Sequence, residues 1–293
     1  MALKKRKKAK GISLALGGGG ARGFAHLGVL QVLEENNIPV KAISGCSMGA
    51  IVGGLYAHYQ DVSMVKDFIL SMMTKPAFKD LNLDLFSSKK KKIKRNFAFD
   101  FNRSIQRYFN YYKTIKNTSM ISKNVLDKIL EDFPDVKIEN LKIPFIANAT
   151  DLISGQEFLL KKGNLKNAVL ASASIPAVFP PVKRKNLLLV DGGVTDLVPV
   201  RALKNKYEYP VVGVDVESTI FGDSYFPNGL QILWRVQEIQ FHHLAYERKK
   251  EADLIIRPNV SKYTWADVHL MDKFIEEGRK ITLDILDEIK KLN

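Results

Sequence analysis

The pentapeptide Gly45-Cys46-Ser47-Met48-Gly49 contains the serine whose surroundings most clearly suggest chemistry. It fits the pattern G-x-S-x-G and lies between a predicted strand, residues 39–44, and a predicted helix, residues 50–59. The two glycines permit a tight turn, because a Cβ at either position would crowd the neighbouring strand and helix. Such a turn exposes the Ser47 hydroxyl at the positive end of the helix. We therefore expect Ser47 to be a nucleophile; the alternative is a serine that only caps an ordinary strand-to-helix turn.

A glycine-rich loop follows the predicted strand of residues 12–16 and opens a helix. Consecutive glycines allow successive backbone N–H groups to point into one concavity. We expect the amides of Gly18, Gly19 and Gly20, together with the charge of Arg22, to stabilise an oxyanion.

The same loop has a second interpretation, because Gly18, Gly20 and Gly23 satisfy G-x-G-x-x-G, a pattern of nucleotide-binding loops. A dinucleotide site requires an acidic residue at the end of the second strand, but that strand carries Lys41 and runs directly into the serine turn. A phosphate loop of the type G-x-x-x-x-G-K-[ST] is also absent from the sequence. These differences favour the oxyanion hole over a nucleotide site.

The candidate base is Asp191, which ends the apolar run of residues 187–190 and precedes Gly192 and Gly193. We expect it at the carboxyl edge of a sheet, where α/β proteins place functional groups. Partial burial beside a serine would raise the pKa of the carboxylate and make it a better proton acceptor. Taken alone, an Asp-Gly pair is equally typical of a turn.

The order glycine-rich loop, G-x-S-x-G and D-G-G resembles the patatin-like phospholipases, particularly their compact bacterial members. The resemblance extends over residues 11–215, and the segments 171–176 (Ala-Ser-Ala-Ser-Ile-Pro) and 179–181 (Phe-Pro-Pro) are similar to the family's segment before the aspartate strand. It implies a dyad of Ser47 and Asp191, acylation of the serine by a lipid ester, and release of the acyl group by water. It also implies that Gly18, Gly19 and Gly20 form the oxyanion hole, and that no cofactor is needed.

Histidine and metal chemistry have little support in the sequence. Hydrolases with a Ser-His-Asp triad on an α/β fold place the histidine after the acid, and His242, His243 and His269 satisfy that order without any motif around them. We therefore expect solvated histidines there and a packed helix residue at His26. No cluster has the spacing of a zinc or calcium site. Cys46 is predicted to be a small packed side chain and not a second nucleophile.

The elements around these motifs predict an α/β fold with three layers, a central, mostly parallel sheet and helices on both faces. Repeated strand–loop–helix units begin the chain, and residues 145–150 and 156–160 are predicted to form a hairpin. Further strands are predicted over residues 187–190, 211–216 and 254–257. Further helices are predicted over residues 122–133, 229–250 and 272–292. We expect a basic tail over residues 1–10 and a single domain over 11–293, with an insertion or lid at about 75–118.

Composition limits the partners of the chain. Lys and Arg number 45 against 31 Asp and Glu, a net charge of +14, which predicts an anionic partner such as a membrane surface or nucleic acid. Basic residues 89–95 next to aromatic-rich residues 97–112 suit an anionic lipid interface better than single-stranded nucleic acid, and a solvated surface loop is the third possibility. A single cysteine, no export signal and no run of about 18 apolar residues predict a cytoplasmic protein with peripheral membrane contact at most.

We therefore predict a phospholipase A or lysophospholipase that cleaves lipid acyl esters. Two other functions stay open at this point. One is a soluble acyl esterase or thioesterase, and the other is a non-catalytic basic protein that binds nucleotide or nucleic acid.

Overall fold

The computed structural model describes residues 10–85, 87, 118–217 and 229–293. The basic run of residues 89–95, the aromatic-rich residues 97–112 and all but the last residue of the basic tail lie outside this part of the chain.

Within the described residues, eight strands form one sheet in the order β5-β6-β3-β2-β1-β7-β8, with β4 paired to β3. The pairs β1–β2, β1–β7, β2–β3 and β7–β8 are parallel, whereas β3–β4, β3–β6 and β5–β6 are antiparallel. The strands are β1 (Ile12–Leu16), β2 (Val40–Gly45), β3 (Phe145–Asp151), β4 (Glu157–Leu160), β5 (Val182–Arg184), β6 (Leu187–Asp191), β7 (Val211–Val214) and β8 (Leu254–Ile256).

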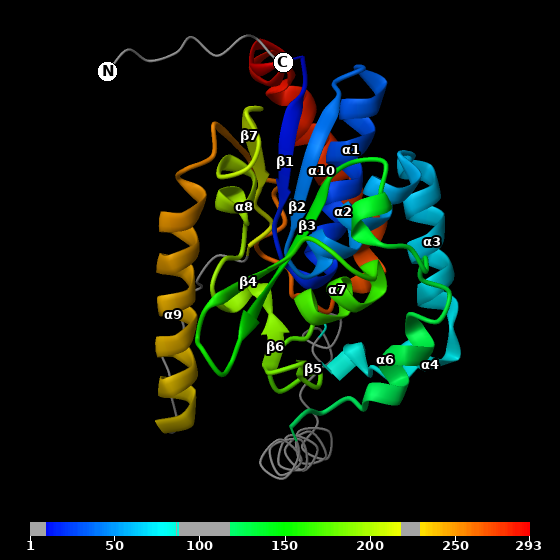
Figure 1. The fold of residues 1–293 in the computed structure, drawn as a ribbon, viewed down its shortest axis with the longest axis vertical. Coiled ribbons are helices and arrows are strands. Elements are labelled where there is room, and N and C mark those ends of the chain that lie inside the picture. The colour runs from blue at the N-terminus through cyan, green and yellow to red at the C-terminus, as the bar shows by residue number, and fades with distance from the viewer. Residues whose placement is uncertain (1–9, 86, 88–117, 218–228) are drawn as a thin grey trace, which may run out of the picture.

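Helices cover both faces of the sheet, as predicted. Along β1, Leu14 and Leu16 belong to the large core under α1 and α2, while Ala15 between them belongs to a second core with Val200 and Leu203 of α8. Successive side chains of a strand point to opposite faces, so this alternation defines three layers. Figure 1 shows α9 along one flank and α3, α4 and α6 along the other.

The helices predicted from the sequence are present with altered bounds, and the structure adds α3, α4, α7 and α8, which the sequence analysis did not predict. The predicted helix over residues 122–133 is shorter, and the predicted closing helix over 272–292 is interrupted at Ile285. The helices are α1 (Ala25–Glu35), α2 (Met48–Tyr59), α3 (Val62–Thr74), α4 (Pro76–Lys79), α6 (Lys123–Ile129), α7 (Leu165–Ser172), α8 (Val200–Lys204), α9 (Gly229–Lys249), α10 (Met271–Asp284) and α11 (Leu286–Leu292).

The direction of β6 corrects the reason given for the position of Asp191. We predicted that Asp191 ends its strand at the carboxyl edge of a mostly parallel sheet, but β6 is antiparallel to β3. Gly45 at the end of β2 lies opposite Ala147 of β3, and Asp191 lies opposite Ala149, two residues further along β3. The aspartate reaches the level of the serine turn because β3 extends beyond β2 and β6 returns along that extension.

Candidate active site

Ser47 lies in a strained turn between β2 and α2. Its backbone has φ 53° and ψ −120°, a conformation that non-glycine residues seldom adopt and that often marks functional sites. A Cβ on Gly45 would overlap the Gly49 carbonyl, and one on Gly49 would overlap the carbonyl of Leu16. Both glycines are therefore required by close approach of backbone.

The backbone of Ser47 is held by a neighbouring serine. Its N–H donates to Ser172 Oγ at 3.0 Å, which ties the turn to the end of α7. Ser172 belongs to the Ala-Ser-Ala-Ser segment noted in the sequence, but nothing in that pattern indicated this contact.

Asp191 is a buried carboxylate next to the turn. Its Oδ1 accepts the Gly193 N–H at 2.8 Å and lies 3.6 Å from the thiol of Cys46. Its Oδ2 is buried without a hydrogen bond of standard geometry. Burial raises the pKa of Asp191 to about 6, against the opposing effects of hydrogen bonding from Ser47, Gly193 and Cys46. Such a carboxylate is ionised above pH 6 and still accepts a proton readily.

The glycine-rich loop faces Ser47, but one of its amides is already used. Gly18 donates its N–H to Leu197 O at 3.0 Å, so in this structure that amide is not free for the oxyanion hole predicted for it. Leu197 lies far along the chain from Gly18, so the glycine pattern could not indicate this hydrogen bond. Within the described residues, the amides of Gly19 and Gly20 donate no hydrogen bond, and Gly20 lines the same cavity as Ser47. These two amides are the remaining candidates.

Arg22 supports the loop from behind. Its Nε donates to Val216 O and its Nη1 to Tyr263 O, both at 3.0 Å. Burial lowers the pKa of Arg22 to about 10, and the nearby charges of Glu217, Asp215 and Asp267 act in the opposite direction. At neutral pH the guanidinium therefore stays charged. We revise its predicted role from oxyanion stabiliser to brace of the loop, because these donors are bound to carbonyls.

His26 also holds the loop and does not reach the reacting groups. Its Nε2 lies 2.8 Å from Gly17 O, and since a carbonyl only accepts, the proton is assigned to this nitrogen. Burial lowers the pKa of His26 to about 4, so the ring is neutral. This confirms the prediction of a packed histidine.

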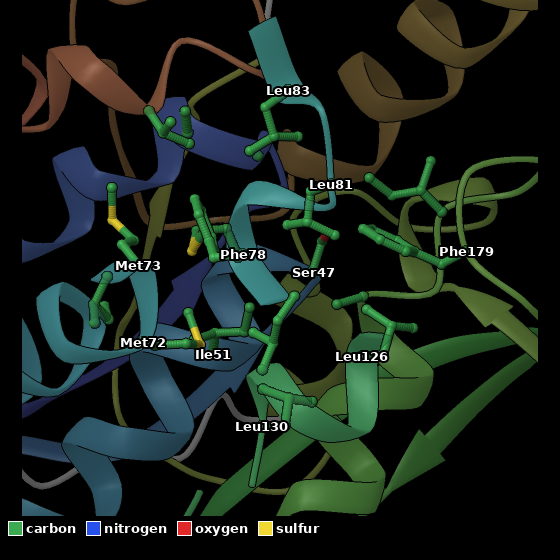
Figure 2. A pocket seen from close by; sticks show the side chains of 18 of the residues that line it. Ser47, Ile51, Met72, Met73, Phe78, Leu81, Leu83, Leu126, Leu130 and Phe179 are labelled. Carbon is green, nitrogen blue, oxygen red and sulfur yellow. The ribbon is translucent and has the colours of Figure 1, made fainter. Parts of the chain in front are cut away.

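An apolar cavity opens at the hydroxyl of Ser47 (Figure 2). Helices α2, α3, α6 and α7 form its walls, and Phe78, Leu81 and Leu83 of α4 and the following turn also line it. No charged side chain of the described residues lines it. Beside Ser47 the lining includes Ile51, Ile69, Met72, Met73, Phe78, Leu81, Leu83, Leu126, Ile129, Leu130, Leu170 and Phe179.

The other histidines lie away from this site. Neither the partners of Asp191 nor the cavity lining includes a histidine among the described residues. His242 on α9 is close enough to Glu217 to influence the pKa of that carboxyl. In the part of the chain that the structure covers, no three His, Cys, Asp or Glu side chains gather as a metal centre would require.

Comparison with known proteins places the chain in a family. Residues 14–204 match the patatin-like phospholipase family. An uncharacterized NTE family protein of Mycobacterium tuberculosis is 33% identical over 210 residues, which cover 71% of this chain and 48% of that protein. Lysophospholipase NTE1 of Cryptococcus neoformans is 34% identical over 220 residues, covering 71% of this chain and 11% of the fungal protein.

A solved structure shares the fold at low sequence similarity. VipD from Legionella pneumophila has a TM-score of 0.54 at 16% identity, with 96% of this chain and 67% of VipD covered. The chain thus spans less than half the length of the two relatives above. The match over residues 14–204 includes the glycine-rich loop, the serine turn and Asp191, and the chain belongs to the patatin-like phospholipase family.

Proposed function

We propose that this protein is a serine hydrolase that cleaves the acyl ester of lysophospholipids or phospholipids. The observation that carries the proposal is the position of Ser47, whose hydroxyl lies between a buried carboxylate with a raised pKa and a cavity lined by apolar side chains. The lysophospholipase name of a relative that matches most of this chain adds support.

In the proposed reaction, Oδ2 of Asp191 takes the proton of the Ser47 hydroxyl as Oγ attacks the ester carbonyl. The amides of Gly19 and Gly20 stabilise the oxyanion of the tetrahedral intermediate. When the C–O bond breaks, the leaving alcohol takes the proton from Asp191. Water then repeats the sequence on the acyl-enzyme, releasing a fatty acid and restoring Ser47.

The cavity favours a long acyl chain as the part of the substrate that is bound. Burying one methylene contributes about 0.8 kcal/mol, so an apolar cavity of this kind selects lipid chains over small acyl groups. A charged headgroup has no partner on these walls and must stay outside. We propose that residues 75–85, which include Phe78, Leu81 and Leu83, are the described part of a lid within a single domain.

We also propose peripheral contact with anionic membrane, as an extension of the lipid substrate. The net charge of +14 would attract such a surface, and the basic and aromatic residues 89–112 are the candidate contact, although they lie outside the described residues. Among the helices that the structure covers, none combines the length and apolarity needed to cross a bilayer. Co-sedimentation with anionic and neutral vesicles tests this point, and equal binding to both would contradict it.

The decisive experiment uses a fluorophosphonate probe and a panel of esters. We expect the probe to label Ser47, identified by peptide mass spectrometry, and the protein to hydrolyse lysophosphatidylcholine. Ser47→Ala should lose both, because the acyl-enzyme cannot form. Ser63→Ala, an exposed serine on α3, is the matched control and should retain both.

The panel also separates this function from its nearest alternative. A soluble esterase or thioesterase would label equally well, so labelling alone does not decide between them. Faster turnover of short-chain esters or acyl thioesters than of lysophospholipid would favour that alternative. Absence of labelling on folded protein would exclude the serine mechanism altogether.

A further inference from the structure

Lys249, the last residue of α9, is a buried cation near the glycine-rich loop. Only 4% of its surface is exposed, whereas the next residue, Lys250, lies on the surface. Lysine is almost never fully buried unless its ammonium is paired, because removing a charge from water is costly. A buried lysine at the end of a surface helix therefore requires an explanation.

The ammonium of Lys249 bridges two carboxylates that follow β7. Its Nζ lies 2.7 Å from Asp215 Oδ2 and 3.0 Å from Glu217 Oε2. Arg257, just after β8, donates a further hydrogen bond to Asp215 Oδ2 at 3.0 Å. Burial alone would raise the pKa of Asp215, but the bonds from Lys249 and Arg257 outweigh it and the pKa is lowered. Asp215 is therefore held ionised, whereas burial raises the pKa of Glu217 against the opposing charge of Lys249.

The residue between the two carboxylates forms the wall behind the candidate oxyanion hole. Val216 is 1% exposed, and its carbonyl accepts the hydrogen bond of Arg22. A Cβ on Gly19 would lie 2.8 Å from Val216 Cγ2 and 2.9 Å from Val216 O, so the two residues already touch. The position of Gly19 is thus set by the position of residue 216.

We infer that Lys249 is a positioning residue for the oxyanion hole, which it serves by holding the carboxylates on either side of Val216. The inference rests on the proposed function, in which the Gly19 amide is an oxyanion donor. Such donors work only when fixed in place before the reaction. Without the ammonium, Asp215 and Glu217 repel each other across one residue, Val216 shifts, and the loop loses its wall.

The competing explanation is that Lys249 only fastens α9 to the body of the protein. Both explanations predict a loss of stability when Lys249 is replaced. They differ in what happens to the molecules that remain folded, since only a positioning role lowers the rate of the chemical step while substrate binding stays intact.

The test compares Lys249→Met with Lys250→Met in the full chain, at a temperature where melting curves show both to be folded. Lys250 is the matched control, because it is adjacent and exposed, and it contacts Glu247 and the ring of Tyr246 on α9, away from Asp215 and Glu217. On lysophosphatidylcholine we expect kcat of Lys249→Met to fall on the order of 100-fold, the usual effect of losing one oxyanion donor, with KM little changed. Lys250→Met should match the unaltered protein. Lys249→Arg should recover part of the rate.

A milder variant covers the case in which Lys249→Met does not fold. Lys249 together with Asp215 and Glu217 is called the clamp here. Glu217→Gln removes the charge of one carboxylate of the clamp and leaves the ion pair of Lys249 with Asp215 in place. We expect it to fold and to show a smaller fall in kcat. The inference is overturned if folded Lys249→Met has the same kcat as Lys250→Met, or if only its KM changes. Where Lys249→Met does not fold, the same criterion applies to Glu217→Gln.

A measurement without turnover separates this inference from the proposed function. In protein labelled with ¹⁵N-glycine, the Gly19 amide resonance should shift or broaden in Lys249→Met and Glu217→Gln but not in Lys250→Met. If the unaltered protein has no activity but the Gly19 resonance still shifts in the variants, the proposed function is refuted and the structural link between Lys249 and Gly19 is kept. If the unaltered protein is active but the Gly19 resonance is unchanged in both Lys249→Met and Glu217→Gln, only the link between Lys249 and Gly19 is refuted.

Discussion

Gly193 donates its N–H to Oδ1 of Asp191 at 2.8 Å, which fixes one oxygen of the carboxylate and leaves the other, Oδ2, buried and without such a bond. The amide and the carboxylate are two residues apart, so the D-G-G sequence itself provides this anchor. A carboxylate held in this way has one oxygen engaged in the structure and one left to accept a proton.

The rate should follow the ionisation of Asp191. The pKa of this group is raised to about 6, and only the ionised form accepts the serine proton. We expect kcat/KM to rise about tenfold per pH unit below 6 and to level off above it. Asp191→Asn should remove this dependence and lower the rate by several orders of magnitude. A pH–rate profile that stays flat between pH 4 and 7 in the unaltered protein would exclude Asp191 as the base.

The same group should lower the stability of the fold at neutral pH. Because the folded pKa lies above the unfolded value of 3.8, the folded state holds its proton longer, and stability falls as pH rises from about 4 to about 6. A shift of roughly two units corresponds to about 3 kcal/mol. We expect Asp191→Asn to be more stable than the unaltered protein by up to that amount at pH 8, and equal to it at pH 3.

Urea unfolding at several pH values provides the measurement. Asp196, whose pKa burial raises to about 7, is present in both proteins, so its contribution cancels in the difference. An Asn variant that is less stable than the parent at pH 8 would show that the carboxylate is a structural anchor and not a strained functional group.

Gly19→Val should greatly lower the rate of ester hydrolysis, because it displaces the glycine-rich loop. A Cβ at this position would lie within 2.9 Å of both Val216 Cγ2 and Val216 O, so the loop must move away from its place. Displacing one oxyanion donor costs on the order of 100-fold in rate. Gly229→Val is the control, because a Cβ there meets nothing within 4 Å. Comparable turnover by the two variants would remove the loop from the mechanism.

Met73→Trp should shorten the acyl chain that the enzyme accepts. Met73 lies on α3 and lines the cavity beyond Ser47 (Figure 2), and a larger side chain there would occupy space used by the chain. We expect kcat/KM for long-chain esters to fall while short-chain esters are hydrolysed normally. Met64→Trp, an exposed position on the same helix, should leave the preference unchanged. Equal loss on all chain lengths would indicate that the cavity does not hold the acyl chain.

The sequence was sufficient for the features that are local. An apolar run predicted β2, the two glycines predicted the Ser47 turn, and the residues after the turn predicted α2. These elements could be predicted because strand, turn and helix each depend on neighbouring residues. The family and the three-layer fold followed from the same motifs and are confirmed.

The features that depend on distant residues could not be predicted in this way. The apolar run of β6 has no property that distinguishes parallel from antiparallel pairing. The Gly18 amide is used by Leu197, and Arg22 is directed at Val216 and Tyr263, each more than 170 positions further along the chain. The helix α3 was not predicted at all, and the helical spacing of residues 122–133 did not indicate that side chains of α6 line a cavity.

The walls of this cavity also bear on how the fatty acid leaves. Side chains from α2, α3, α6, α7 and residues 78–83 line the space, so a bound chain would contact several helices at once. Each further methylene that must return to water adds about 0.8 kcal/mol to the cost of departure. For long chains, we therefore expect the fatty acid to leave more slowly than it does for short chains.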